Sequence, residues 1–269
     1  MRIAFIGAGK VGCSLARYLG ESGAADIAGF FSRSESSTRE AVEFAGGAAF
    51  TSLADIAEAA DAVFVTTPDG AIREVAEELT ACGVDLDGKI VVHCSGATSS
   101  EALAVCRDTG ALVASMHPLY AVSSRFDCWQ ELGRAWFSLE GDEAAVGTLE
   151  ALLDNLGNKH GRIDAAQKTR YHAAAVMASN LVVGLYDMAA GELARCGLDR
   201  AEAESALAAL FLGNAQHIAS DGVEASLTGP AARGDQATID GHLACLNGRD
   251  RKVYELLTDE LFEIAARRK

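Results

Sequence analysis

The chain has 269 residues, and its 38 acidic and 23 basic side chains give a formal net charge of −15. Hydrophobic residues make up 49% of the chain and charged residues 23%, a globular composition that excludes long disordered regions and allows one large domain or two modest ones. Nucleic acids and anionic membranes attract positive surfaces, so the acidic balance predicts neither as a partner.

Three features bear on the compartment. No run of about 18 apolar residues appears, so we expect no membrane-spanning helix. The apolar N-terminal stretch is too short for a signal peptide. The seven cysteines are scattered and include no C-x-x-C pair, which is typical of a reducing compartment. We therefore expect a cytoplasmic protein.

Short apolar runs alternate with stretches of helical periodicity over about the first 165 residues. The apolar runs predict strands at residues 3–6, 27–31, 62–66, 90–94, 111–115 and 135–139. The stretches between them predict helices at 11–19, 38–44, 71–79, 100–109 and 144–156. This alternation is typical of an α/β fold, in which helices cover both faces of a doubly wound parallel sheet.

The pattern becomes wholly helical from residue 165. Residues 165–193 are apolar on every side near their middle, which predicts one long helix that is buried all round. Further helices are expected at 200–219, 237–246 and 250–267, without strands. The sequence thus predicts an α/β domain at residues 1–164 and an all-helical domain at 165–269.

A glycine-rich turn follows the first predicted strand and opens the first helix. It fits G-x-G-x-x-G, where the glycines permit a tight turn, close approach of a pyrophosphate and close packing of the helix on the sheet. The free N–H groups of the helix then bind the anion. The motif predicts a Rossmann-like dinucleotide-binding domain that contacts its cofactor through Gly7, Ala8, Gly9, Lys10, Val11 and Gly12.

The end of the second strand favours NADP over NAD. NAD enzymes usually place Asp or Glu there to bind the ribose 2′-hydroxyl. This sequence has Ser32, Arg33 and Ser34 instead, which can hold a 2′-phosphate. The alternative is that Arg33 is a solvated loop residue. Two further strand ends should line the cofactor cleft, and they carry Thr66, Thr67, Pro68, Ser95 and Gly96.

Hydride transfer to a carbonyl or imine requires an acid beside the nicotinamide. Lys168 and His172 are four residues apart and so share one face of the long helix, with Asn180 two turns further on. We expect Lys168 and His172 to be acid and oxyanion partners, in an order that stays open. Asn180 and Ser95 are expected to orient the substrate, with His117 as a cleft contact. The alternative is a hydrogen-bonded structural network. No metal site is predicted, because no H-x-x-x-H pattern or cysteine pair occurs.

Several short motifs are spread over nearly the whole chain, at Arg2–Gly9, Thr67–Asp69, Ser95–Gly96, His117–Pro118, Tyr171–Ala175, Ser179–Asn180, Leu227–Pro230 and Arg233–Asp235. Together they resemble a bacterial NADP oxidoreductase family in which a Rossmann-like domain precedes a helical domain of unknown function. That family is similar in architecture to ketopantoate reductase, pyrroline carboxylate reductase and prephenate dehydrogenase. The resemblance implies a homodimer formed through the helical domain and a small 2-oxo acid as substrate.

The sequence departs from the ketopantoate reductase pattern at one point. Those relatives place an Asn four residues after the lysine of the interdomain helix, whereas here Lys168 is followed by His172. We expect an NADP-dependent oxidoreductase that reduces a small anionic 2-oxo acid, resembling ketopantoate, or a related imine. One alternative is a non-catalytic NADP-binding sensor or partner-binding protein. Another is oxidation of a substrate similar to prephenate.

Overall fold

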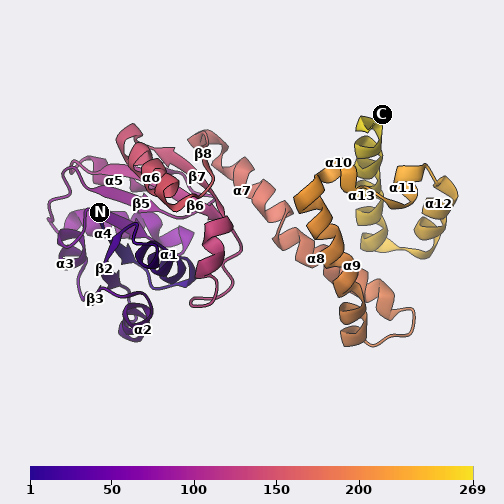
Figure 1. Ribbon diagram of the computed structural model, residues 1–269, viewed down its shortest axis with the longest axis horizontal. Coiled ribbons are helices and arrows are strands. Elements are labelled where there is room, and N and C mark those ends of the chain that lie inside the picture. The colour runs from indigo at the N-terminus through magenta and orange to yellow at the C-terminus, as the bar shows by residue number, and fades with distance from the viewer. Residues whose placement is uncertain (269) are drawn as a thin grey trace. The chain divides into compact units, whose positions relative to one another are not determined.

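The computed structural model describes residues 1–268 and divides into two compact units, Met1–Ser179 and Asn180–Lys269. The first unit contains all the strands, and the second consists of helices (Figure 1). The α/β domain followed by a helical region confirms the predicted fold class. The domain boundary predicted after residue 164 stays a prediction. The compact units divide further along the chain, after Ser179, and the buried Lys168 belongs to the first unit.

An eight-stranded sheet in the order β3-β2-β1-β4-β5-β6-β7-β8 forms the centre of the first unit. The chain builds outward from β1 in both directions, which places a topological switch point between β1 and β4. Crevices outside the carboxyl ends of strands at such a point are where ligands bind in open α/β sheets. The strands are β1 (Arg2–Ile6), β2 (Asp26–Phe31), β3 (Ala48–Ala49), β4 (Ala62–Val65), β5 (Ile90–His93), β6 (Leu112–Leu119), β7 (Trp136–Gly141) and β8 (His160–Arg162).

Both faces of the sheet are buried, because successive residues of a strand point to opposite faces. Phe5 and Phe64 belong to a core packed against α1 (Lys10–Glu21), α2 (Glu35–Ala45) and α6 (Glu143–Leu156). Val63 and Val65 belong to a second core on the other face, under α3 (Leu53–Glu58), α4 (Ile72–Ala81) and α5 (Ala104–Arg107). The predicted apolar runs therefore form the interior of a three-layered unit.

The expectation of an all-parallel sheet is wrong at one pair of strands, since β7 runs antiparallel to β6. The segment between them contains no crossover α-helix and instead carries a 3₁₀ helix at Trp129–Arg134. A direct return of this kind reverses the chain, whereas a crossover helix would keep the strands parallel. The hydrophobic pattern has no direction, so it gave no sign of the reversal. The short β3, β8 and α3 were not predicted either.

The second unit consists of helices, as predicted. The α9 helix begins at a capping box in which Asp199 and Glu202 each bond the other's backbone N–H. The short helices α10 and α11 were not predicted. The helices are α8 (Asn180–Ala194), α9 (Arg200–Asp221), α10 (Val223–Ser226), α11 (Gly229–Arg233), α12 (Gln236–Cys245) and α13 (Gly248–Arg267).

The single long helix predicted for residues 165–193 is interrupted. A 3₁₀ turn at Ala165–Gln167 leads into α7 (Lys168–Met177), and α8 starts only at Asn180. At the break the N–H of Ser179 donates to the carbonyl of Val176, three residues back, while its hydroxyl donates to Ala175. Residues 178–179 thus form a turn between the two helices, stabilised in part by the serine hydroxyl.

The expectation that this helix is buried all round is also wrong within residues 1–268. In α7 only Lys168 is buried, and in α8 only Ala190. Apolar side chains such as Met177, Leu181 and Val183 are exposed. The sequence was expected to contain no membrane-spanning helix. By length and composition alone, however, the helical stretch 165–194 is long and apolar enough to cross a membrane. A core helix passes the same test, so this stretch is weak evidence for a membrane.

Candidate functional site

The glycine-rich turn between β1 and α1 has two positions that tolerate no side chain. Gly7 has a φ of +118°, and a Cβ there would lie 2.7 Å from the carbonyl of Thr66. A Cβ on Gly12 would lie 2.5 Å from both the Gly7 carbonyl and the Thr66 hydroxyl. Nothing lies within 4 Å of a Cβ on Gly9. The first and third glycines thus allow the close packing expected of them, and the second borders open space.

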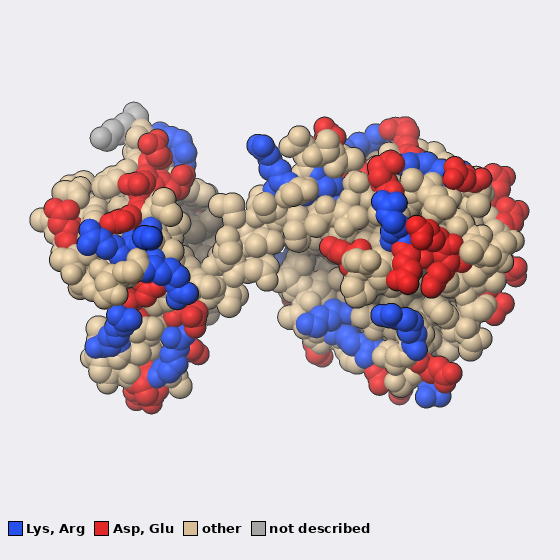
Figure 2. All heavy atoms as spheres, turned by 180° about the vertical axis from the view of Figure 1, so that it is seen from behind, with Lys and Arg blue, Asp and Glu red and all other residues tan. Residues whose placement is uncertain are grey.

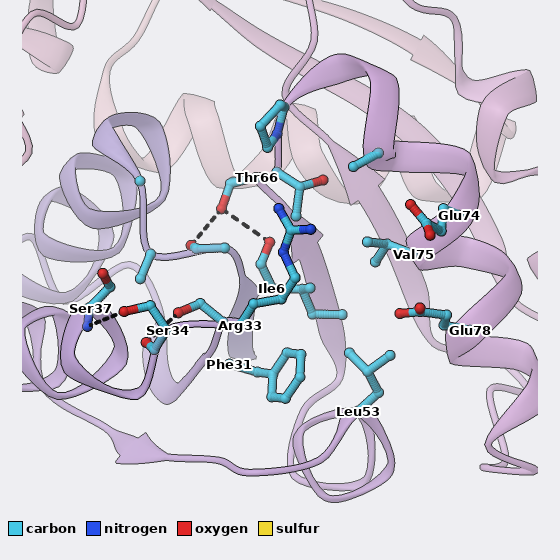
Figure 3. A pocket seen from close by; sticks show the side chains of 17 residues that line it. Ile6, Phe31, Arg33, Ser34, Ser37, Leu53, Thr66, Glu74, Val75 and Glu78 are labelled. Atoms are coloured by element: carbon cyan, nitrogen blue, oxygen red, sulfur yellow. Dashed lines mark hydrogen bonds between the residues drawn. The ribbon is translucent and has the colours of Figure 1, made fainter.

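A cavity of about 410 Å³ lies at this turn (Figure 3). The glycine loop, the end of β2 and the end of β4 form three of its walls, and α4 contributes Glu74 and Glu78. Lys10, Val11 and Gly12 are not among its lining residues, and neither are Ser95 and Gly96. The predicted cofactor residues that do line it are Gly7, Ala8, Gly9, Ser32, Arg33, Ser34, Thr66, Thr67 and Pro68.

Polar groups with no partner face this cavity. The N-cap Gly9 gives α1 no side-chain cap, so the first N–H groups of the helix are left for an anion. The hydroxyl of Thr67 is buried without a hydrogen bond among the described residues. The guanidinium of Arg33 extends into the cavity and makes no hydrogen bond or ion pair within residues 1–268 (Figure 3). These groups fit a dinucleotide phosphate.

Ser32 and Ser34 shape the loop around Arg33. The Ser32 hydroxyl donates to the Ser34 carbonyl at 2.8 Å and lies 2.9 Å from the Thr38 hydroxyl. The Ser34 hydroxyl caps α2 by accepting from the N–H of Ser37 at 3.3 Å. Both serine hydroxyls are therefore engaged within the protein, and Arg33 is the member of the trio whose polar groups are unpaired.

A second polar cluster lies along the same edge of the sheet, at the ends of β5, which adjoins β4, and of β6, the next strand. Lys168 reaches it from the first turn of α7 and is only 2% exposed. Its ammonium donates to the Ser95 carbonyl and to the Ser115 hydroxyl, each at 2.7 Å. Burial lowers the pKa of Lys168, and the carboxylate of Glu140 opposes that effect. The first contact holds the loop after β5, and the second ties the same ammonium to β6.

Two histidines flank Gly96 in this loop. A Cβ on Gly96 would lie 2.8 Å from Nδ1 of His172 and 2.9 Å from Nε2 of His117, so only glycine fits between the rings. Nδ1 of His117 lies 2.7 Å from the hydroxyl of Tyr171, and the two rings meet edge to face. Nδ1 of His172 is buried without a hydrogen bond among the described residues.

Two histidines at this edge of the sheet, His117 and His93, are held neutral. Burial lowers the pKa of His117 to about 4, helped by the charges of Lys168 and His172, while Asp69 raises it slightly. Burial likewise lowers the pKa of His93 to about 4. His93 is fully buried at the end of β5, where its Nδ1 accepts the N–H of Ser95 at 3.1 Å.

Four of the five residues predicted to carry the chemistry come together here: Lys168, His172, His117 and Ser95. Asn180 starts α8 in the second unit, and its orienting role stays a prediction. The sequence reasoning missed Tyr171. The available signal was spacing, because residues 168, 171 and 172 share one helix face. The Lys168 ammonium binds Ser95 and Ser115, which supports a positioning role, whereas its predicted contact with substrate stays a prediction.

Comparison with known proteins agrees with this architecture. Residues 1–118 match the model of a Rossmann-like domain, and residues 135–261 match DUF2520, a domain of unknown function. The chain is a Rossmann-like domain followed by a DUF2520 helical domain. The predicted resemblance is thereby confirmed. No curated protein matches the chain.

Solved structures with this architecture cover the whole chain. Protein TM1727 from Thermotoga maritima is 28% identical with a TM-score of 0.75, over 99% of this chain and 100% of that one. A "putative NADP oxidoreductase" from Bacteroides fragilis is 25% identical with a TM-score of 0.72, over 97% and 98%. A pyrroline-5-carboxylate reductase from Coxiella burnetii is 15% identical with a TM-score of 0.66, over 98% and 97%. The Rossmann-DUF2520 protein thus has the fold of NAD(P)-dependent reductases.

Proposed function

We propose that this Rossmann-DUF2520 protein is an NADP-dependent oxidoreductase that reduces a small anionic 2-oxo acid, or a related imine, by hydride transfer. The observation that carries the proposal is the cavity at the β1–α1 turn, where an uncapped helix end and an unpaired arginine converge. An unpaired cation and free N–H groups are what a phosphorylated dinucleotide requires. The solved structures with the same fold include a pyrroline carboxylate reductase with NADP bound and an imine reductase variant in complex with NAD+.

The choice of NADP rests on Arg33. Its guanidinium can form charge-assisted hydrogen bonds with a 2′-phosphate, and no carboxylate stands at the end of β2 to bind a 2′-hydroxyl. Glu74 and Glu78 line the cavity on α4, so an anion there must bind on the side of Arg33 and the helix end. The geometry supports the oxidised or reduced form of NADP equally.

The cluster around Gly96 supports the position of the chemistry. When bound, NADPH supplies the hydride. The carboxyl ends of β4 and β5 are neighbours, so a cofactor along the cavity would present its nicotinamide towards Ser95 and Gly96. The Lys168 ammonium holds this loop by donating to the Ser95 carbonyl, and His117 and His172 flank Gly96. These side chains would orient the substrate and stabilise charge on its oxygen or nitrogen.

The test is turnover of a substrate panel. Purified protein is mixed with NADPH and a series of 2-oxo acids and cyclic imines, and NADPH consumption is followed by absorbance. We expect consumption with at least one member and none when His117 is replaced by Asn. Reduction of NADP by a hydroxy acid alone would show that oxidation is the physiological direction. NADPH binding without turnover of any member would indicate a sensor and contradict the proposal.

A further inference from the structure

Tyr171 and His117 form a hydrogen-bonded pair at the edge of the Gly96 loop, and nothing in the sequence analysis assigned Tyr171 a role. The phenol oxygen lies 2.7 Å from Nδ1 of the imidazole, and the ring centroids are 5.6 Å apart at an interplanar angle of 89°. The two residues come from α7 and β6, so the pair forms only in the folded unit. Such a bond fixes both the orientation of the imidazole and the nitrogen that carries its proton.

The direction of this hydrogen bond follows from the surroundings. The ammonium of Lys168 lies 6.0 Å from the centre of the Tyr171 ring and disfavours a second positive charge on His117. A neutral imidazole has one N–H and one acceptor nitrogen. Burial also raises the pKa of Tyr171, and the Ser138 hydroxyl opposes this only in part, so the phenol keeps its proton. A phenol is the stronger donor and an imidazole nitrogen the stronger acceptor, so the Tyr171 hydroxyl donates to Nδ1. The proton of His117 therefore lies on Nε2.

Nε2 of His117 is free to meet a ligand. It forms no hydrogen bond with any group in residues 1–268. It is also not fully buried, so a ligand can reach it. It lies against Gly96, at the end of β5. The neighbouring strand β4 ends at Thr66 and Thr67, which line the dinucleotide cavity. The two strand ends thus lie at the same edge of the sheet, and a substrate held there beside the cofactor can reach this N–H.

We propose that Tyr171 is a positioning residue that keeps the His117 proton on Nε2, where it donates a hydrogen bond to the carbonyl oxygen or imine nitrogen of the substrate. The inference rests on the proposed function for the identity of the acceptor. The tautomer itself is a property of the protein alone. The hydrogen bond polarises the C=O or C=N group before hydride arrives. The oxygen or nitrogen that gains negative charge then takes its proton from water, so His117 keeps its own.

The test compares the tautomer of His117 in the wild type and in Tyr171→Phe. The chain has six histidines, so selective ¹⁵N labelling of histidine gives ring spectra that can be assigned with His117→Asn. We expect two-bond ¹H–¹⁵N correlations to show a proton on Nε2 in the wild type and a mixture of tautomers in Tyr171→Phe. A proton on Nδ1 in the wild type, or an unchanged His117 in Tyr171→Phe, would overturn the inference.

The second half of the molecule offers a matched control. His242 and Tyr254 form another pair, with Nδ1 and the hydroxyl 2.6 Å apart and the rings at 87°. Tyr254→Phe should alter the ring signals of His242 and leave those of His117 unchanged. A change at His117 in this variant would mean that the spectra report general loosening, and the inference would fail.

Kinetics separate this inference from the proposed function. With a substrate found in the panel, Tyr171→Phe should lower kcat by about 10- to 100-fold, the usual cost of losing a group that orients a histidine, and leave the Kd of NADPH unchanged. If turnover is found and Tyr171→Phe keeps the full kcat, the inference falls and the proposed function stands. If NADPH does not bind, but the spectra show the expected tautomers of His117, the proposed function is contradicted and the inference about Tyr171 stands.

Discussion

Arg33 is the residue on which the proposed preference for NADP rests. Its guanidinium extends into the cavity at the β1–α1 turn without a partner among the described residues, while the flanking Ser32 and Ser34 are bonded within their own loop. The serines were predicted to share the phosphate with Arg33. Their bonds suit them to holding the loop in shape, so most of the discrimination between NADP and NAD should come from one side chain.

Arg33→Ala should raise the KM for NADPH far more than the KM for NADH. Removing a charged hydrogen-bonding partner of a phosphate costs about 1.5–3 kcal/mol, or a factor of roughly 10 to 100 in affinity. The 2′-hydroxyl of NADH loses no such contact. Steady-state kinetics with both cofactors measure the ratio. Equal increases for the two would contradict the assignment of NADP.

His93 should make the stability of the first unit depend on pH. Its pKa is about 4 in the folded state against an ordinary 6.5, so folding favours the neutral ring. The stabilisation is complete above pH 6.5 and is lost as the pH falls towards 4. Relative to His93→Gln, the wild type should lose up to about 3 kcal/mol of unfolding free energy over this range. Urea titrations at pH 7 and pH 4 give both values, and a pH-independent difference would contradict the predicted ionisation.

The β1–α1 turn shows which parts of an element the sequence reveals. Its G-x-G-x-x-G spacing predicted the strand, the turn and the helix, because each glycine answers a local steric need that the structure displays at Gly7 and Gly12. The antiparallel β7 and the pair of Tyr171 with His117 were not predicted. Both depend on contacts between distant segments, and hydrophobic periodicity carries neither strand direction nor partner identity.

Gly12→Ala and Gly9→Ala should separate packing from binding at this turn. A methyl group on Gly12 meets backbone at 2.5 Å, so we expect a loss of about 1–3 kcal/mol in unfolding free energy. A methyl group on Gly9 meets nothing within 4 Å, so the loss should be below about 1 kcal/mol while NADPH binding weakens. Chemical denaturation and NADPH titration measure the two effects. Equal destabilisation by both variants would contradict the assigned contacts.

The second unit exposes large apolar side chains on several of its helices. Val183, Leu210 and Leu256 are each at least 70% exposed. The face in view in Figure 2 shows few charged side chains along the helical stretch of α7 and α8. Large apolar side chains exposed to this extent favour an interface. We propose that a second copy of the chain covers them, as the resemblance implied; a membrane is the competing occupant.

Leu210→Asp should therefore convert a dimer into a monomer, because a buried carboxylate would be uncompensated at the interface. Light scattering during gel filtration measures the mass. Leu119→Asp is the matched control, since Leu119 is an exposed leucine of the first unit, and it should leave the dimer intact. A monomeric wild type, or one that stays in solution only with detergent or lipid, would contradict the proposal.

Calorimetric titration of NADPH into the intact protein tests the dinucleotide site most directly. We expect saturable binding to the wild type and none to Gly9→Glu, whose carboxylate would enter the open space at the helix end and repel the phosphates. The variant should remain folded, because no atom lies within 4 Å of its Cβ. No heat with the wild type, or equal binding to Gly9→Glu, would show that this cavity is not a dinucleotide site.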